Sequence, residues 1–350
     1  MSIRSALYYP HTKIQSEALF KTALLLWDKL HIIAPSPRYI PNYSSRAQNE
    51  AFELIGRCHY PSDKEKQQTH ELVEDFATRP LPDAFSYRAA NGSTAIYEVY
   101  SDKLLPETWQ VLHEAGLAGR RSGLRGYPTA ESTGLSLMSL LADCCAGKSL
   151  ARVTDRALAY ASLAGLLTGV QDASVATEKA RQALLPIAVT IADVQDLALE
   201  GWIAFRKREE GASDGHLVRQ LRHRFVACIE AQAQTLAAAE NSRDREELRR
   251  QFEQDMRDDY RALREALKLE AHQTLGTKEL ITAVVGGIAT IGAVATHQLL
   301  PMPGVITATG AIVAVGGLIA GRGRFLSSRR KLLVEHPMAY LYEAGDGLRL

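Results

Sequence analysis

The 350-residue chain has little cysteine and no excess charge of either sign. Its four cysteines, Cys58, Cys144, Cys145 and Cys228, form no C-x-x-C pair and no cysteine–histidine spacing typical of zinc sites. We therefore predict neither a disulfide framework nor a metal site. The 41 basic and 40 acidic residues leave a net charge of +1, which provides no global field to attract nucleic acid or anionic lipid. Any such contact must be local.

The sequence also lacks a targeting signal and a catalytic motif. The N-terminus shows no basic-then-apolar pattern with a small-residue cleavage site, so we expect a cytoplasmic body. Gly147-Lys148-Ser149 matches the end of a phosphate-binding P-loop, but Ala142 stands where the first glycine belongs and the preceding segment is helical. We find no paired carboxylates and no nucleophile with a base. The chain is therefore predicted not to be an enzyme and to need no cofactor.

A strand, helix, strand pattern opens the chain and predicts a small parallel α/β part over residues 1–128. Residues 5–10 and 31–35 are short β-prone runs, and residues 16–30 carry apolar side chains at helical spacing. Ligands of open α/β sheets bind beyond the carboxyl ends of the strands. This rule makes His11, just after the first run, a candidate ligand-binding residue. The alternative is that His11 only packs at the entry to the helix.

A loop at residues 116–127 contains four glycines and three arginines. Close backbone approach and bidentate guanidinium groups are what phosphate recognition needs. We therefore predict that Arg120, Arg121 and Arg125 bind a nucleotide or a short oligonucleotide signal. The alternative is an exposed flexible loop whose arginines keep the protein soluble.

Helical patterns dominate after Ala130. Residues 129–212 predict a helical domain in which Thr154 and Asp155 begin a helix as an N-cap. Residues 213–275 predict one long stalk helix with an apolar stripe that suits coiled-coil-like packing in a homo-oligomer. The stripe consists of Leu248, Phe252, Met256, Tyr260, Leu263 and Leu267. The predicted fold class is α+β and mostly α, with a helical bundle, this long helix and a glycine-rich apolar hairpin.

The apolar hairpin is predicted over residues 276–322. Between Glu279 and Arg322 lie 42 residues without Asp, Glu, Lys or Arg. As helices, its two arms, 280–296 and 304–321, would be about 25 and 27 Å long, near the hydrocarbon thickness of a bilayer. Small residues permit close approach of membrane helices. The glycines concerned are Gly286, Gly287, Gly292, Gly310, Gly316, Gly317 and Gly321. The alternative is a buried hairpin in the core of a large helical protein.

Residues 323–350 form a predicted basic and aromatic C-terminal segment. A basic cluster follows the second arm directly and satisfies the positive-inside rule for a hairpin whose two ends face the cytoplasm. We expect this cluster to contact anionic lipids of the inner membrane. Its members are Arg322, Arg324, Arg329, Arg330 and Lys331.

Three segments, residues 6–35, 132–160 and 191–211, resemble an uncharacterised bacterial family through their hydrophobic patterns. The family brings no catalytic motif, and the resemblance implies a bacterial origin. A cytosolic sensing body joined to a glycine-rich hairpin is similar in architecture to membrane effectors of anti-phage defence systems, which depolarise the infected cell.

The first functional hypothesis is therefore an antiviral effector that permeabilises the inner membrane or forms an ion channel. Its body would hold it inactive until a nucleotide, a short oligonucleotide or a phage protein arrives. The alternative is a soluble, oligomeric nucleic-acid-associated protein or enzyme that uses the hairpin as a buried core. A third hypothesis is a membrane-tethered adaptor that recruits a partner through the long helix.

Overall fold

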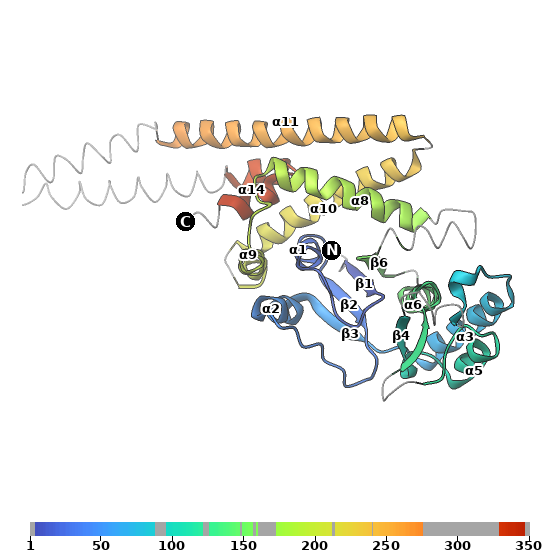
Figure 1. Ribbon diagram of the computed structural model, residues 1–350. Helices are drawn as coiled ribbons and strands as arrows, with labels where there is room; N and C mark the ends of the chain where they lie inside the picture. The colour runs from blue at the N-terminus through green and yellow to red at the C-terminus, as the bar shows by residue number, and fades with distance from the viewer. Residues whose placement is uncertain are drawn as a thin grey trace, which may run out of the picture. The chain divides into compact units, whose positions relative to one another are not determined.

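The computed structural model describes residues 4–87, 96–121, 126–147, 149–156, 159, 173–211, 214–239, 241–275 and 329–346 (Figure 1). The chain divides into two compact units. The first, called here the α/β unit, comprises Met1–Leu185, Asp196–Gly211 and Ile229–Arg245. The second, called the helical unit, comprises Pro186–Gln195, Ala212–Cys228 and Glu246–Leu350.

A four-stranded parallel sheet forms the centre of the α/β unit. Its strands are β1 (Ser5–Tyr9), β2 (Lys29–Ile33), β3 (Gly56–His59) and β6 (Ala151–Thr154), in the order β3-β2-β1-β6. Helix α1 (Glu17–Leu26) joins β1 to β2, and α2 (Arg46–Ile55) joins β2 to β3. The predicted parallel pair at the N-terminus is therefore confirmed, and so is the predicted fold class, α+β and mostly α.

Helices cover both faces of this sheet. In Figure 1, α1 and α2 lie on one side, and α6 (Glu131–Ala146) lies on the other with α3 (Asp63–Thr78) beyond it. Alternate residues of a strand face opposite sides, so Leu7 and Tyr9 share a core with Met138 and Leu141 of α6. The capping box of α3, in which Ser62 and Glu65 exchange hydrogen bonds, fixes where that helix begins. Helix α9 (Leu199–Gly211) contacts α1 and α2.

An antiparallel pair, β4 (Ile96–Tyr100) and β5 (Gly126–Ala130), adds a two-stranded ribbon. The 3₁₀ turns Asp83–Phe85 and Ser101–Lys103 precede and follow β4 along the chain. Helix α5 (Pro106–Glu114) begins with proline in its first turn, where the missing N–H of proline costs no helical hydrogen bond. Strand β5 needs a glycine at its first position, because a Cβ on Gly126 would lie 2.5 Å from the carbonyl oxygen of Val99 in β4.

One predicted helix start is wrong. Thr154 was expected to cap a helix with Asp155, but it is the last residue of strand β6, paired with Tyr9 of β1. Its hydroxyl accepts a hydrogen bond from the backbone of Arg156 (3.0 Å), which turns the chain after the strand. Four residues with two polar side chains give no periodicity of their own, so pairing with β1 decides the conformation.

The single long helix predicted for residues 213–275 is also interrupted. The structure has α10 (Gly215–Ala238) and α11 (Ser242–Leu275). Asn241 begins α11, because its Oδ1 accepts the backbone N–H of Asp244 (2.8 Å). Four of the stripe residues, Phe252, Met256, Leu263 and Leu267, are buried within the single chain. Their apolar pattern therefore does not require a second copy.

The helical unit is held together by contacts between α10, α11 and the C-terminal α14 (Ala339–Asp346). Phe225 of α10 stacks on Tyr340 at a centroid distance of 6.2 Å. Asp259 of α11 accepts from the backbone of Met338 (3.0 Å) and lies 2.8 Å from His336 Nδ1. Helix α8 (Ala173–Ile191) passes from the α/β unit into the helical unit.

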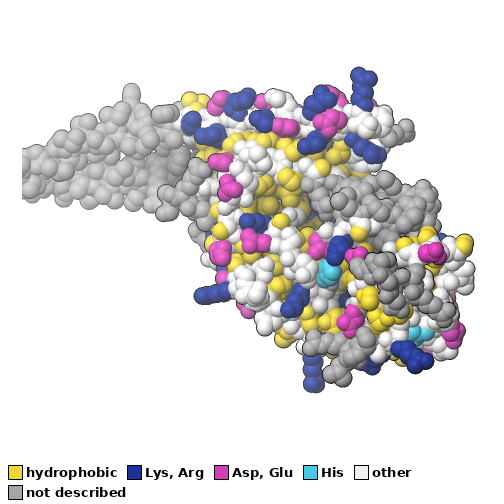
Figure 2. Space-filling view, viewed as in Figure 1, with side chains coloured by type: hydrophobic (Ala, Val, Ile, Leu, Met, Phe, Trp, Pro, Cys, Tyr) yellow, Lys and Arg dark blue, Asp and Glu magenta, His cyan; other side chains and the backbone are white. Residues whose placement is uncertain are grey.

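Within the described part of the chain, no helix combines the length and the apolar character needed to cross a bilayer. The long helix α11 shows why, since acidic and basic side chains alternate along it (Figure 2) and pair as Arg257 with Glu253 (2.6 Å). This finding overturns the prediction of a membrane-permeabilising or channel-forming effector with transmembrane helices. The predicted hairpin, 276–322, with all its glycines, lies outside the described residues.

Candidate functional site

The carboxyl edge of the parallel sheet has a topological switch point between β1 and β6. Strand β2 lies on one side of β1 and is connected to it through α1. Strand β6 lies on the other side of β1 and is the last strand of the sheet in chain order. Open α/β sheets bind ligands where neighbouring connections diverge in this way. Tyr9 pairs with Thr154, so the residues that follow, His11 on one strand and Asp155 and Arg156 on the other, leave from adjacent strand ends.

Asp155 is fixed by a buried tyrosine. Tyr8 Oη donates a hydrogen bond to Asp155 Oδ2 (2.9 Å), and the Tyr8 side chain is fully buried. Burial first, and then the carboxylate of Asp155, raise the pKa of Tyr8 above its ordinary value. The phenol therefore stays protonated and keeps donating. This bond sets the path of the chain just before Arg156.

Arg156 contacts the start of α6. Its Nη1 lies 2.9 Å from Glu131 Oε1, and the two side chains are 43% and 37% exposed. Ion pairs at this exposure contribute only about 0–1 kcal/mol. Arg156 can therefore exchange Glu131 for an anionic ligand at little energetic cost.

An aromatic pair borders the same edge. The rings of His11 and Tyr97, from β4, lie 6.1 Å apart, and Tyr97 Oη donates to the carbonyl of Pro10 (3.3 Å). Burial lowers the pKa of His11, and the positive charges of Arg156 and Lys103 lower it further, while Asp155 acts in the opposite direction. His11 is therefore neutral at pH 7, a ring with a polar edge and no charge.

Lys103 is the most unusual charged group of this region. Its side chain is 2% exposed, and its Nζ has Met138 Sδ at 3.8 Å and the ring of Tyr100 at 5.9 Å. No described residue gives this amine an oxygen acceptor. Burial lowers the pKa of Lys103 to about 7, with Cys145 acting weakly in the opposite direction. Buried, strongly shifted amines concentrate at functional sites.

The predicted ligand-binding residues divide into two groups. His11 lies at the switch point, as the strand-end rule predicts. Arg120 and Arg121 are exposed beside β5, where Ala118 bridges Thr129 and the N–H of Gly119 donates to Pro128. The charges that act most on His11 come from other residues, namely Asp155, Arg156 and Lys103. Arg125 lies outside the described residues.

The predicted lipid-facing cluster is described only in part. Arg329 Nη2 lies 2.6 Å from Glu343 Oε1 of α14, so its charge is paired within the helical unit. It also borders a cavity of about 520 Å³ lined by Tyr260, Arg264 and Tyr342, among others. Arg330 and Lys331 are exposed. The remaining members, Arg322 and Arg324, lie outside the described residues.

Sequence reasoning missed Arg156, Tyr97 and Lys103 as site residues. The predicted N-cap at Thr154 and Asp155 conceals Arg156, because it places this arginine in a helix and not after strand β6. The position of Tyr97 against the carbonyl of Pro10 depends on a contact between segments far apart in the chain. Lys103 follows that strand in a polar turn, where a lysine is normally exposed.

Comparison with known proteins gives no relative. No protein-family model, no curated protein and no solved structure matches the chain. The resemblance to an uncharacterised bacterial family and the predicted homo-oligomer stay predictions. Function must therefore be argued from the site itself.

Proposed function

We propose that the α/β unit binds a phosphate-bearing ligand, a nucleotide or a short oligonucleotide, at the switch point between β1 and β6. The observation that carries the proposal is the convergence of His11, Tyr97 and Arg156, from three separate segments, on one edge of the sheet. The proposal follows the alternative hypothesis, a nucleic-acid-associated protein or enzyme, because the membrane effector is contradicted by the helices described.

Each group has a chemical role in such binding. The guanidinium of Arg156 leaves Glu131 and donates hydrogen bonds to two oxygens of a phosphate, a charge-assisted contact that is about twice as strong as a neutral hydrogen bond. The rings of Tyr97 and His11 offer stacking surfaces for a base. The charge of Lys103 already acts on His11, because it contributes to lowering the pKa of His11. A bound phosphate favours the protonated amine, so the charged fraction of Lys103 rises when the ligand binds.

We propose binding and no reaction at this edge. Asp155, the carboxylate next to Arg156 in the chain, is already engaged by Tyr8 (2.9 Å), and this bond does not change when Arg156 leaves Glu131. A general base must be free to accept a proton from a bound substrate. The prediction that the chain is not an enzyme is therefore kept as part of this proposal.

Calorimetric titration of the full chain with ATP and with a fluorescent tetranucleotide tests the proposal. Arg156→Gln should weaken binding about 10- to 100-fold, the effect of losing one charge-assisted contact. Tyr97→Leu should weaken it through lost stacking, by about 1–3 kcal/mol. The matched control is Arg79→Gln, which removes another exposed arginine of this unit that pairs with a carboxylate, Asp75.

Two results would contradict this placement of the site. If neither probe binds saturably to the full chain, the proposed class of ligand is wrong. If the probes bind but Arg156→Gln and Tyr97→Leu leave the affinity unchanged, the site lies elsewhere. Loss of binding in Arg120→Gln or Arg121→Gln alone would move it to the predicted arginine loop.

A further inference from the structure

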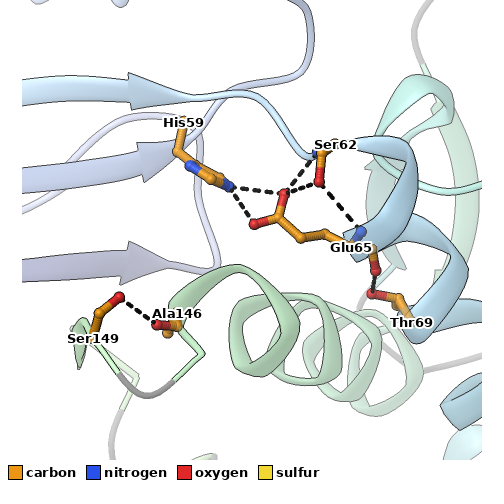
Figure 3. A network of polar contacts seen from close by, with 6 residues as sticks. All are labelled: His59, Ser62, Glu65, Thr69, Ala146 and Ser149. Atoms are coloured by element: carbon orange, nitrogen blue, oxygen red, sulfur yellow. Dashed lines mark hydrogen bonds and ion pairs between the residues drawn. The ribbon is translucent and has the colours of Figure 1, made fainter.

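A second group of side chains in the α/β unit has the composition of a metal site. His59 is the last residue of β3, Glu65 lies in the first turn of α3 and Cys145 lies in the last turn of α6. One ligand atom from each residue lies within 4.8 Å of the other two. In Figure 3, His59 and Glu65 point toward one another, and the end of α6 is marked by Ala146, the neighbour of Cys145.

The carboxylate of Glu65 is held in place by the start of α3. Both the backbone N–H (2.7 Å) and the hydroxyl (2.8 Å) of Ser62 donate to Glu65 Oε2. Oε1, in turn, lies 3.1 Å from His59 Nε2. A ligating carboxylate is usually oriented by hydrogen bonds of this kind. Oε2, which accepts from Ser62, lies 3.2 Å from the same nitrogen, so the capping box holds the whole carboxylate against His59.

The remaining geometry suits a tetrahedral ion. Bonds of about 2.0–2.3 Å from zinc to nitrogen, oxygen and sulfur place ligand atoms roughly 3.5 Å apart in a tetrahedron. The three ligand atoms lie within 4.8 Å of one another, close to that spacing before any ion is bound. Cys145 is 7% exposed, which limits the access of water to its sulfur. His59 and Glu65 are partly exposed and leave a path for the ion.

We propose that His59, Glu65 and Cys145 bind a zinc ion with three protein ligands and an open fourth position. One imidazole, one carboxylate and one thiolate belong to the ligand set that zinc takes in proteins. The sequence does not reveal this site, because its ligands come from three separate elements and only one of them is cysteine. The inference is independent of the proposed phosphate site, since none of its three ligands takes part there.

Cobalt substitution tests the proposal on the full chain. After removal of metal with a chelator under reducing conditions, Co²⁺ is titrated while absorbance is recorded in the near ultraviolet, where a cobalt–thiolate bond gives a charge-transfer band. The wild type should bind one equivalent with this band, and Zn²⁺ should displace the Co²⁺. Cys145→Ser should abolish the band. His59→Gln and Glu65→Gln should each weaken binding about tenfold or more.

The chain supplies matched cysteine controls. Cys58 precedes His59 on the same strand and therefore projects to the opposite face, and Cys228 belongs to the helical unit. Cys58→Ser and Cys228→Ser should keep the band. The proposal is overturned if the wild type gives no band at one equivalent, or if the band survives in Cys145→Ser. Should that variant fail to fold by circular dichroism, unchanged Co²⁺ affinity in folded His59→Gln overturns it equally.

Discussion

Replacing the buried amine of Lys103 should stabilise the α/β unit. Lys103 is 2% exposed, and its Nζ lies 3.8 Å from Met138 Sδ and 5.9 Å from the centre of the Tyr100 ring, with no oxygen acceptor among the described residues. Lys103→Met keeps an unbranched side chain of similar length beside Met138 and removes the ionisable group. The protein then no longer has to release a proton, or bury a charge, in order to fold.

The magnitude follows from the pKa. Burial lowers the pKa of Lys103 from 10.5 to about 7, so the folded protein binds fewer protons than the unfolded chain throughout that interval. The free energy of unfolding therefore rises with pH between pH 7 and 10.5. The destabilisation caused by the lysine is largest below pH 7 and disappears above pH 10.5. At 1.36 kcal/mol for each pKa unit, the destabilisation at pH 7 is about 4 kcal/mol. From pH 7 to about pH 8.5 the wild type should regain about 1.5 kcal/mol.

Urea unfolding followed by tryptophan fluorescence measures this effect in the relevant unit. The three tryptophans, Trp27, Trp109 and Trp202, all belong to the α/β unit. The free energy of unfolding of Lys103→Met minus that of the wild type should be about +4 kcal/mol at pH 7 and should shrink as pH rises. Lys21→Met, which removes a partly exposed lysine paired with Glu17, is the control and should show neither effect.

Two outcomes would refute the reasoning. If Lys103→Met is less stable than the wild type at pH 7, the amine has a partner in the folded protein that outweighs its burial. If the difference between the two proteins does not change between pH 7 and 8.5, Lys103 does not titrate in that range. A residue retained at such a cost is also expected to serve binding, so the variant should bind ATP more weakly than the wild type while being more stable.

Three further perturbations address the fold. Tyr8→Phe removes the hydrogen bond to Asp155 (2.9 Å) and should lower the free energy of unfolding by about 1–2 kcal/mol in the fluorescence assay; an unchanged value would mean that this bond does not position the switch point. Asn241→Ala removes the N-cap of α11 and should cost about 1 kcal/mol by thermal circular dichroism, whereas Asn241→Asp should not; equal losses would contradict the cap. Glu209→Gln removes the carboxylate 2.7 Å from the buried Arg206, which keeps Asp28 at 3.3 Å, and should cost about 1–3 kcal/mol by urea unfolding, so a neutral effect would argue against this ion pair.

The elements that the sequence predicts well are those with their own periodicity. Residues 5–35 alternate between short apolar runs and a helical repeat, and burial of each apolar face decides the structure there. Strands β3 and β6 have four residues each and mixed polarity. Their conformation depends on hydrogen bonds to β2 and β1, which no local pattern encodes.

The stalk prediction went wrong for a related reason. An apolar stripe shows that a helix has a partner, but it does not say whether the partner is another copy or the same chain. In this protein Phe252 and Leu263 are buried by the chain itself. The interruption before α11 was in principle visible, because Asn241 and Ser242 are N-cap residue types within the helical pattern.

The residues of the proposed phosphate site can be predicted only where the order of the strands can be predicted. His11 follows the first strand, so the strand-end rule finds it without knowledge of the rest of the fold. Arg156 reaches the same edge only because β6 pairs with β1, which is a contact between segments far apart in the sequence. Neither composition nor spacing encodes that pairing, and the arginines that composition did single out lie beside β5.

Helix α6 connects the two proposed sites. Its first residue, Glu131, holds Arg156, its middle residue Met138 contacts Lys103, and Cys145 near its end belongs to the proposed zinc site. A helix of 16 residues is about 24 Å long and moves as a rigid element. If zinc bound at one end changes the affinity for ATP at the other by some factor, thermodynamic linkage requires ATP to change the affinity for zinc by the same factor. Measuring both affinities in the same full chain tests that equality, and unequal factors would show that at least one ligand binds at a further site.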